Sequence, residues 1–180
     1  GGNPRLRISE NVYYVSTKNI STCLLRIHRT LCRACQITNS TFDGNTAVDY
    51  GGVICVDEGT LTISNTSFVN SSSGEWGGTI FVQDTDLSVT SSSFGISETI
   101  DGGASGGHIA AYSDDWTYDD VVISNTTFTD GTARFEGGSI MVWWARVSIT
   151  GGSFTNNYAT GDGGAVNFYE VEDSSITGVT

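Results

Sequence analysis

The sequence predicts an all-β fold, a parallel β-helix (solenoid) of about five to six coils with a repeat of about 26 residues. Two motifs predict it, and they alternate along the chain. The first is a strand-like segment ending in Phe, at 37–42, 63–68, 89–94, 123–128 and 149–154, and a sixth copy begins at 176–178. The second begins with two glycines, at 51–56, 77–82, 106–111, 137–142 and 163–168. The starts of the first motif are 26, 26, 34, 26 and 27 residues apart. A unit this short cannot bury its own apolar face, so it must stack on copies of itself.

The composition excludes several other classes. Ser and Thr account for 45 of the 180 residues, Gly for 23, and charged residues for only 16%. Strong helix formers are therefore scarce, which excludes a helical bundle or a coiled coil. No apolar run approaches the ~18 residues of a membrane span, so we expect no membrane insertion. No segment resembles a signal peptide, so we expect a mature chain or a piece of a longer precursor.

The apolar residues of the repeats align into three columns. Alternation in the glycine motif places Ile54 and Val56 on one face of a strand and Cys55 on the other. The first column contains Ile54, Ile80, Ile109, Ile140 and Val166; the second contains Ile37, Ile63, Val89, Ile123, Ile149 and Ile176; the third contains Phe42, Phe68, Phe94, Phe128 and Phe154. We expect each column to form a continuous stack inside the solenoid, with the paired glycines at a tight corner.

The N-terminal segment fits the repeat poorly. We expect residues 1–36 to form an irregular first coil or cap that carries cysteines, and residues 37–180 to form the β-helix repeats, within a single structural domain. Alternating residues at 5–15 are typical of a strand, which would cover the otherwise open edge of the first coil.

The two motifs together resemble the repeats of the chlamydial polymorphic outer membrane proteins, in which GG-x-[IV] is paired with F-x-x-N. Both halves are complete at Phe42–Asn45 with Gly51–Ile54, and at Phe154–Asn157 with Gly163–Val166. Three coils depart from the pattern, with Ser71, Ser97 and Gly131 at the Asn position. The resemblance covers about residues 37–170 and implies a right-handed parallel β-helix. It also implies an extracellular or cell-surface protein with an adhesive or structural role.

Four cysteines lie in the first third of the chain: Cys23, Cys32, Cys35 and Cys55. In a secreted β-rich chain we expect them to form two disulfides that pin the N-terminal cap, and three pairings are open. A zinc site would need a second close Cys pair or a nearby His, and only His28 is near. We therefore expect no metal here.

Five Asn-x-Ser/Thr sequons are candidate N-glycosylation sites: Asn19, Asn39, Asn65, Asn70 and Asn125. Three of them, Asn39, Asn65 and Asn125, occupy the same place in the repeat, between a strand and the following turn. Two interpretations stay open. Glycans would line one edge of the solenoid if this corner faces solvent, or the asparagines simply favour turn geometry and stack through their amides.

A polysaccharide lyase or hydrolase is the enzymatic alternative, because many carbohydrate-active enzymes are parallel β-helices. Such an enzyme would need carboxylates that converge on a cleft. Alignment of the coils places Glu58, Asp84, Ser113, Trp144 and Glu170 at one position after the glycine strand. This acidic column is interrupted, and no Lys or Arg from residues 34–133 lies near it in sequence. We therefore assign no catalytic residue and interpret the column as a solvated edge.

One coil carries eight additional residues between 94 and 123, and insertions in solenoids form protruding loops. Its candidate binding residues are Asp114, Asp115, Trp116, Tyr118, Asp119 and Asp120. Calcium or a sugar would suit this chemistry, but no recognised calcium spacing is present, so a plain polar loop is an equal alternative. Trp76, Trp143 and Trp144 add aromatic surface for carbohydrate or a neighbouring subunit, and His108 is expected to be structural.

The net charge of −12 argues against nucleic acid as a partner, and the charge is unevenly distributed. Residues 1–33 carry +5 and residues 34–180 carry −17. In a solenoid this split becomes an axial dipole, so the basic first coil can meet the acidic last coil of another copy. The candidate assembly residues are Arg5, Arg7, Arg26, Arg29 and Arg33 with Glu170, Glu172 and Asp173.

These observations predict a non-enzymatic extracellular structural or adhesive protein, a glycosylated subunit that stacks head to tail into a filament. Its partners would be further copies of itself and glycans, and we expect no resident cofactor apart from the calcium alternative. An adhesin passenger fragment of a larger surface protein is the other alternative.

Overall fold

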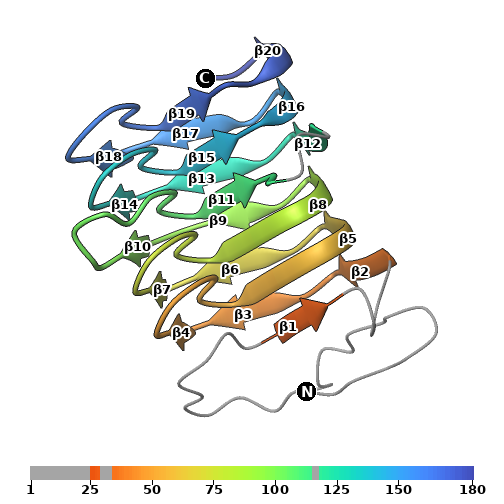
Figure 1. The fold of residues 1–180 in the computed structure, drawn as a ribbon. Coiled ribbons are helices and arrows are strands. Elements are labelled where there is room, and N and C mark those ends of the chain that lie inside the picture. The colour runs from red at the N-terminus through yellow and green to blue at the C-terminus, as the bar shows by residue number, and fades with distance from the viewer. Residues whose placement is uncertain (1–24, 29–33, 115–117) are drawn as a thin grey trace.

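The computed structural model describes residues 25–28, 34–114 and 118–180, which form three parallel β-sheets stacked as a solenoid (Figure 1). Sheet A contains β1 (Leu25–His28), β2 (Ala34–Thr38), β5 (Ile54–Ser64), β8 (Ile80–Thr90), β11 (Ile109–Tyr112), β12 (Asp119–Ser124), β15 (Ile140–Trp143), β16 (Ala145–Thr150), β19 (Val166–Tyr169) and β20 (Glu172–Thr177). Sheet B contains β3 (Thr41–Asp43), β6 (Ser67–Val69), β9 (Ser93–Phe94), β13 (Thr127–Thr129) and β17 (Ser153–Thr155). Sheet C contains β4 (Thr46–Ala47), β7 (Ser71–Ser73), β10 (Ser97–Thr99), β14 (Gly131–Ala133) and β18 (Tyr158–Ala159). The predicted all-β parallel solenoid is confirmed.

Each coil contributes one strand to sheet B, one to sheet C, and either one bent strand or two strands to sheet A. The chain passes along sheet B, turns into sheet C, and then follows sheet A around a corner to start the next coil. In β5 and β8 the strand continues around that corner, whereas later coils divide it into pairs such as β11 with β12. The N-terminal colours lie at one end of the stack and the C-terminal colours at the other (Figure 1). Chain order is therefore axial order.

The strand registers align equivalent repeat positions, as the sequence predicts. Ile54 pairs with Ile80, which pairs with Ile109, and the same column continues to Ile140 and Val166. The second and third predicted columns are paired in the same way. β1 extends the first column by one coil, because Leu25 pairs with Ile54. Strand pairing therefore begins before residue 37, at β1 and β2.

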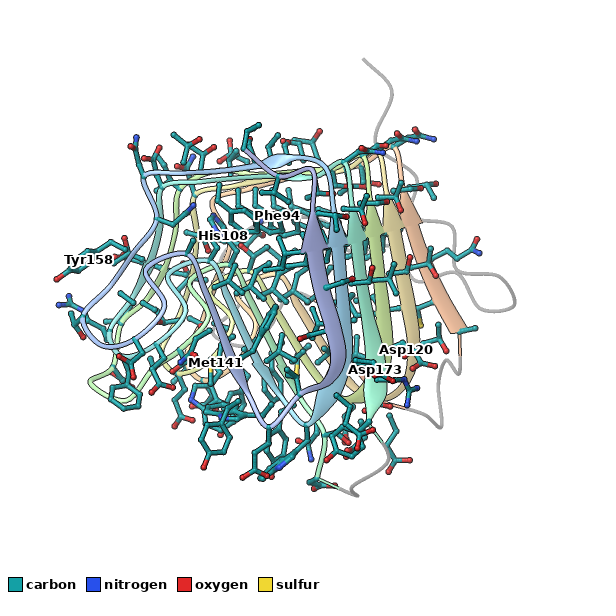
Figure 2. All side chains as sticks on the ribbon, turned by 90° about the horizontal axis from the view of Figure 1, so that it is seen from above. Phe94, His108, Asp120, Met141, Tyr158 and Asp173 are labelled. Carbon is teal, nitrogen blue, oxygen red and sulfur yellow. The ribbon has the colours of Figure 1, made fainter. Side chains whose placement is uncertain are left out.

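The core of the solenoid is a stack of phenylalanine rings with aliphatic columns beside it. Ring centroids along Phe42, Phe68, Phe94, Phe128 and Phe154 are 5.1, 4.8, 4.9 and 4.9 Å apart, and each pair is nearly parallel. Phe68, Phe94 and Phe128 are fully buried, whereas the two end rings are only partly buried. Figure 2, which looks along the stack, shows Phe94 inside the coil. Ring spacing equals strand spacing, so the apolar contact continues from coil to coil.

The paired glycines allow successive coils to touch through their backbones. Gly77 has a φ of +65°, which a residue with a side chain rarely adopts. A Cβ on Gly78 would lie 2.2 Å from the carbonyl oxygen of Gly107 in the next coil. The first glycine thus makes the corner and the second permits the close approach.

The departure from the F-x-x-N pattern at Gly131 has a packing cause. Where Asn is present, as at Asn157, its side chain accepts a hydrogen bond from the backbone N–H of Gly131 and donates one to the carbonyl of Phe128. At the position one coil earlier, Gly131 leaves room for the His108 ring, since a Cβ on Gly131 would lie 2.5 Å from that ring. The missing side chain of one coil is therefore replaced by the imidazole of another.

His108 is held neutral inside the core. Its ring is fully buried and lies 5.8 Å from the centroid of Phe94 and 5.7 Å from that of Phe128. Within the described part of the chain, neither ring nitrogen has a hydrogen-bond partner of normal geometry. Burial lowers the pKa of His108 from 6.5 to about 3, and the backbone of Thr129 offsets this only in part.

The first prediction concerns the phenylalanine stack. Phe128→Ala should lower the free energy of unfolding by about 3–5 kcal/mol, because it leaves a cavity between two stacked rings. Phe154→Ala is the matched control and should cost less, since Phe154 is only partly buried. Urea unfolding measures both, and equal losses would contradict the ring stack as the centre of the core.

The second prediction follows from the pKa of His108. Because the folded pKa is lowered, the unfolded chain binds a proton below pH 6.5 that the folded chain refuses until about pH 3. This contribution is absent above pH 6.5 and destabilises the fold by up to about 1.4 kcal/mol per pH unit as the pH falls. Urea unfolding at pH 7 and pH 4.5 should therefore show a smaller loss for His108→Leu than for the unsubstituted chain. Identical pH dependence in the two proteins would show that folding does not lower the pKa of His108.

Candidate functional surface

The corners of the solenoid are built from residues in the left-handed region. Asn39, Asn65, Ser91 and Asn125 form one column, with φ between 48° and 50°, and glycines continue it at 151 and 178. A second column contains Glu58, Asp84, Trp144 and Glu170, with φ between 46° and 60°. A third contains Gly44, Asn70, Asp130 and Asn156. Asn, Asp and Gly tolerate this conformation best, so corner geometry accounts for much of the repeat's composition.

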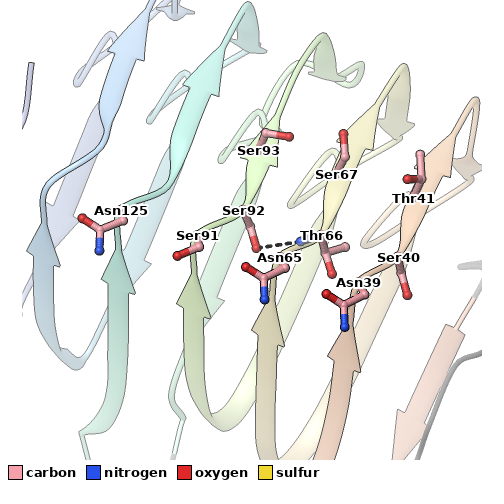
Figure 3. A pocket seen from close by; sticks show the side chains of 10 residues that line it. All are labelled: Asn39, Ser40, Thr41, Asn65, Thr66, Ser67, Ser91, Ser92, Ser93 and Asn125. Carbon is pink, nitrogen blue, oxygen red and sulfur yellow. Dashed lines mark hydrogen bonds between the residues drawn. The ribbon is translucent and has the colours of Figure 1, made fainter.

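The sequon corner is a shallow polar groove of about 670 Å³ (Figure 3). Its lining residues are Asn39, Ser40, Thr41, Asn65, Thr66, Ser67, Ser91, Ser92, Ser93 and Asn125. The buried hydroxyls of its floor are satisfied within the fold. Thr66 donates to the carbonyl of Ser64 at 2.9 Å, and Ser92 donates to that of Thr90 at 2.9 Å. Ser92 also accepts the backbone N–H of Thr66 at 3.2 Å, which ties neighbouring coils together.

The asparagine amides of this groove are exposed and lie in a row along the axis (Figure 3). Turn geometry, one of the two interpretations of these residues, is therefore present. Asn39 and Asn65 occupy successive coils about 4.8 Å apart, so glycans on both would crowd each other. Asn125 lies two coils beyond Asn65, with Ser91 between them. Glycosylation stays a prediction at these sites and at exposed Asn70, while Asn19 lies outside the described residues.

The acidic column lies on the corner between the two halves of sheet A. Glu58, Asp84, Trp144 and Glu170 follow one another along the axis because each occupies the same left-handed turn position, whereas Ser113 has no positive φ. Trp144 donates its indole N–H to Glu170 at 2.5 Å. In residues 25–28, 34–114 and 118–180, no three His, Cys, Asp or Glu side chains lie close enough together to hold a metal ion.

The described residues of the protruding loop are tied to the coils beside it. The backbone N–H of Asp114 donates to Asp84 at 2.8 Å, and Gln83 donates to the Asp114 carboxylate at 3.0 Å. On β12, Asp120 forms an ion pair with Arg146 at 2.7 Å. Tyr118 and Asp119 are half-buried, and Asp115 and Trp116 lie outside the described residues. Calcium binding by this loop stays a prediction.

An aromatic layer covers the outer face of β5, β8, β11 and β15. It consists of Tyr50, Trp76, Phe81, Tyr112, Trp143 and Trp144. Its tryptophans were predicted from the sequence as aromatic surface, whereas Tyr50, Phe81 and Tyr112 were not. The missing signal was the register, since Tyr112 pairs with Gln83 on one side and with Trp143 on the other.

The described cysteines differ from each other. Cys35 is a buried residue of β2 and is disulfide-bonded. Cys55 is a buried thiol, so the prediction that all four cysteines form disulfides is wrong at this position. The physical reason is its place on the outer face of β5, where Phe81 and the aromatic layer cover it. Cys23 and Cys32 lie outside the described residues, so the pairing of Cys35 stays open.

The predicted assembly residues at the C-terminal end are all exposed. Glu170, Glu172 and Asp173 lie at or beside β20, the last strand of sheet A. Arg26 lies on β1 at the other end of the stack, and Arg5, Arg7, Arg29 and Arg33 lie outside the described residues. The structure thus places the described members of the two sets at opposite ends of the solenoid.

Comparison with known proteins identifies the repeat type. A family model described as the Chlamydia polymorphic membrane protein repeat matches residues 39–57 and 151–169. These are the two segments in which both motifs are complete, so the resemblance inferred from the sequence is confirmed. No curated protein and no solved structure matches the chain significantly. In the described residues, no helical segment has the length and hydropathy of a membrane span.

The third prediction separates the two interpretations of the corner asparagines. In protein made without glycosylation, Asn65→Ala should lower the free energy of unfolding by about 1–2 kcal/mol, because alanine is disfavoured at a φ of +49°. Asn65→Gly is the matched control and should cost clearly less. Equal losses in urea unfolding would contradict a conformational role for this residue.

Proposed function

We propose that this chain is a non-enzymatic, surface-displayed structural or adhesive β-helix whose copies stack head to tail. Support for surface display comes from the match to a repeat of a membrane protein family. The uniform coil supports a structural role, since every wall presents the same kind of side chain once per coil along the axis. Such a surface offers many equivalent contacts to a partner.

The observation that carries the stacking proposal is the distribution of charge along the axis. Glu170, Glu172 and Asp173 are exposed at or beside β20, and Arg26 lies on β1 at the other end of the described stack. In our proposal these two regions of neighbouring copies meet, and the parallel strands of one copy pair with those of the next.

Charge gives this contact its polarity. The C-terminal coil carries exposed carboxylates, and the first 33 residues carry a net charge of +5. Opposite charges favour head-to-tail contact and oppose contact between like ends. A heterologous contact that does not close on itself produces a filament.

The fourth prediction tests assembly. The chain should form elongated particles by negative-stain imaging and light scattering at low salt, and raising the salt to about 500 mM should weaken assembly through screening. Glu172→Gln with Asp173→Asn should raise the concentration needed for assembly about threefold to tenfold, by removing two end charges. Asp43→Asn with Glu98→Gln is the matched control, because it removes two charges from β3 and β10.

Monomers at every concentration and salt would contradict stacking. Assembly that is insensitive to salt and to both variants would show that strand pairing alone joins the ends. Release of reducing or unsaturated sugars from uronate polymers, abolished by Glu58→Gln or Asp84→Asn, would contradict the non-enzymatic role.

A further inference from the structure

The outer face of sheet A carries a second apolar layer beyond the solenoid core. Cys55, Phe81, Ala110 and Met141 point away from the core, yet they are only 8%, 6%, 1% and 0% exposed. Other rings of the aromatic layer pack against this surface: Trp76 lies 6.1 Å from the Phe81 ring, and Tyr50 lies 4.8 Å from it. In Figure 2 the Met141 label marks this face, across the coil from Phe94.

The covering rings are inclined to one another and form a faceted surface. Trp76 and Trp143 lie 4.8 Å apart at 50°, and Tyr112 meets Trp143 at 6.2 Å and 86°. Trp144 adds a further ring, 5.4 Å from Tyr112 at 60°. Tyr50 is exposed and the tryptophans and Tyr112 are half-exposed, so parts of these rings face solvent.

Carboxylates flank the aromatic layer on two sides. Asp49 and Glu75 lie in the turns that precede β5 and β8. The acidic column, which includes Asp84 and Glu170, lies on the opposite side, at the corner between the two halves of sheet A. The hydroxyl of Tyr50 hydrogen-bonds to Glu75, and this bond, burial and the charge of Asp49 raise the pKa of Tyr50 to about 12. Glu75 and Asp49 therefore both lie close to the Tyr50 ring.

Positive charge is scarce on the described chain. In residues 34–114 and 118–180 the basic side chains other than histidine are Arg134 and Arg146. Arg146 lies on β16, the other half of sheet A, and is paired with Asp120. The aromatic layer thus combines ring faces with a negative rim, which is the chemistry that binds organic cations.

We propose that the aromatic layer is a docking surface for an extended, Lys- and Arg-rich peptide segment of a partner protein. Cationic head groups lie over the ring faces and beside the rim carboxylates, while the aliphatic stems of Lys and Arg pack on the rings. The layer runs from Tyr50 to Trp144 across four coils, or about 14 Å at the strand spacing. An extended peptide of about five residues covers that length. The rings of this surface lie on the side of the stack, and of the residues named for stacking only Glu170 also belongs to its rim.

The chain contains its own reporter, since three of its four tryptophans belong to the layer. Octalysine and octaarginine peptides, added at 150 mM salt, should change tryptophan emission and give a saturable isotherm by calorimetry. Trp143→Leu keeps an apolar cover over Met141 but removes one ring face, and it should weaken binding about fivefold.

The rim is tested by substitutions that remove its charges and keep an acceptor oxygen for the Tyr50 hydroxyl. Asp49→Asn with Glu75→Gln should weaken octalysine binding about threefold to tenfold at 150 mM salt, where the Debye length is about 8 Å. The control Asp43→Asn with Glu98→Gln removes the same charge from β3 and β10 and should change affinity less than twofold. All variants should keep the circular dichroism of the parent chain.

Three outcomes would overturn the proposal. Binding of neutral chitohexaose without binding of octalysine would identify the layer as a saccharide platform. Equal weakening by the rim variant and its control would reduce the effect to net charge. Saturating binding of octaglutamate would contradict the charge argument directly.

Discussion

The stacking of the coils in this protein depends on corners that close in the left-handed conformation at positions which, with few exceptions, repeat from coil to coil. One corner residue per wall must accept a positive φ, and Asn, Asp or Gly occupies most of these positions. Once the corners coincide, the strands between them fall into register, and like side chains meet at strand spacing. The phenylalanine stack and the isoleucine columns are consequences of that registration.

The same constraint explains what the sequence made predictable. The columns of Ile and Phe were predictable because a fixed period maps equal positions onto equal places in the coil. The aromatic layer was not, because Tyr50 lies in a turn outside both motifs and Tyr112 belongs to the coil with the insertion. The rings of the aromatic layer are brought together by the strand register between coils. The positions of the tryptophans in the sequence do not show which other rings lie beside them. Cys55 failed as a disulfide candidate for a related reason, since alternation placed it correctly on the outer face but could not show that this face is covered.

The acidic column and the sequon column illustrate how one residue choice serves two requirements. In the sequence, Glu58 and Asp84 are candidate site carboxylates and the corner asparagines are candidate glycosylation sites. In the structure, all of them also occupy left-handed turns. Their spacing along the axis is fixed by the strands, so they form rows rather than a converging cluster. A row suits repeated weak contacts with an extended partner.

Near-identical coils create a difficulty during folding, because any coil can pair with the edge of any other. The packing of the His108 ring against Gly131 of the next coil disfavours such mispairing. If the chain skipped a coil, the imidazole would meet the side chain of Asn157 at the place where Gly131 leaves room. The coil that contains His108 can therefore stack only on the coil that contains Gly131. This fit restricts the order of the coils in the stack.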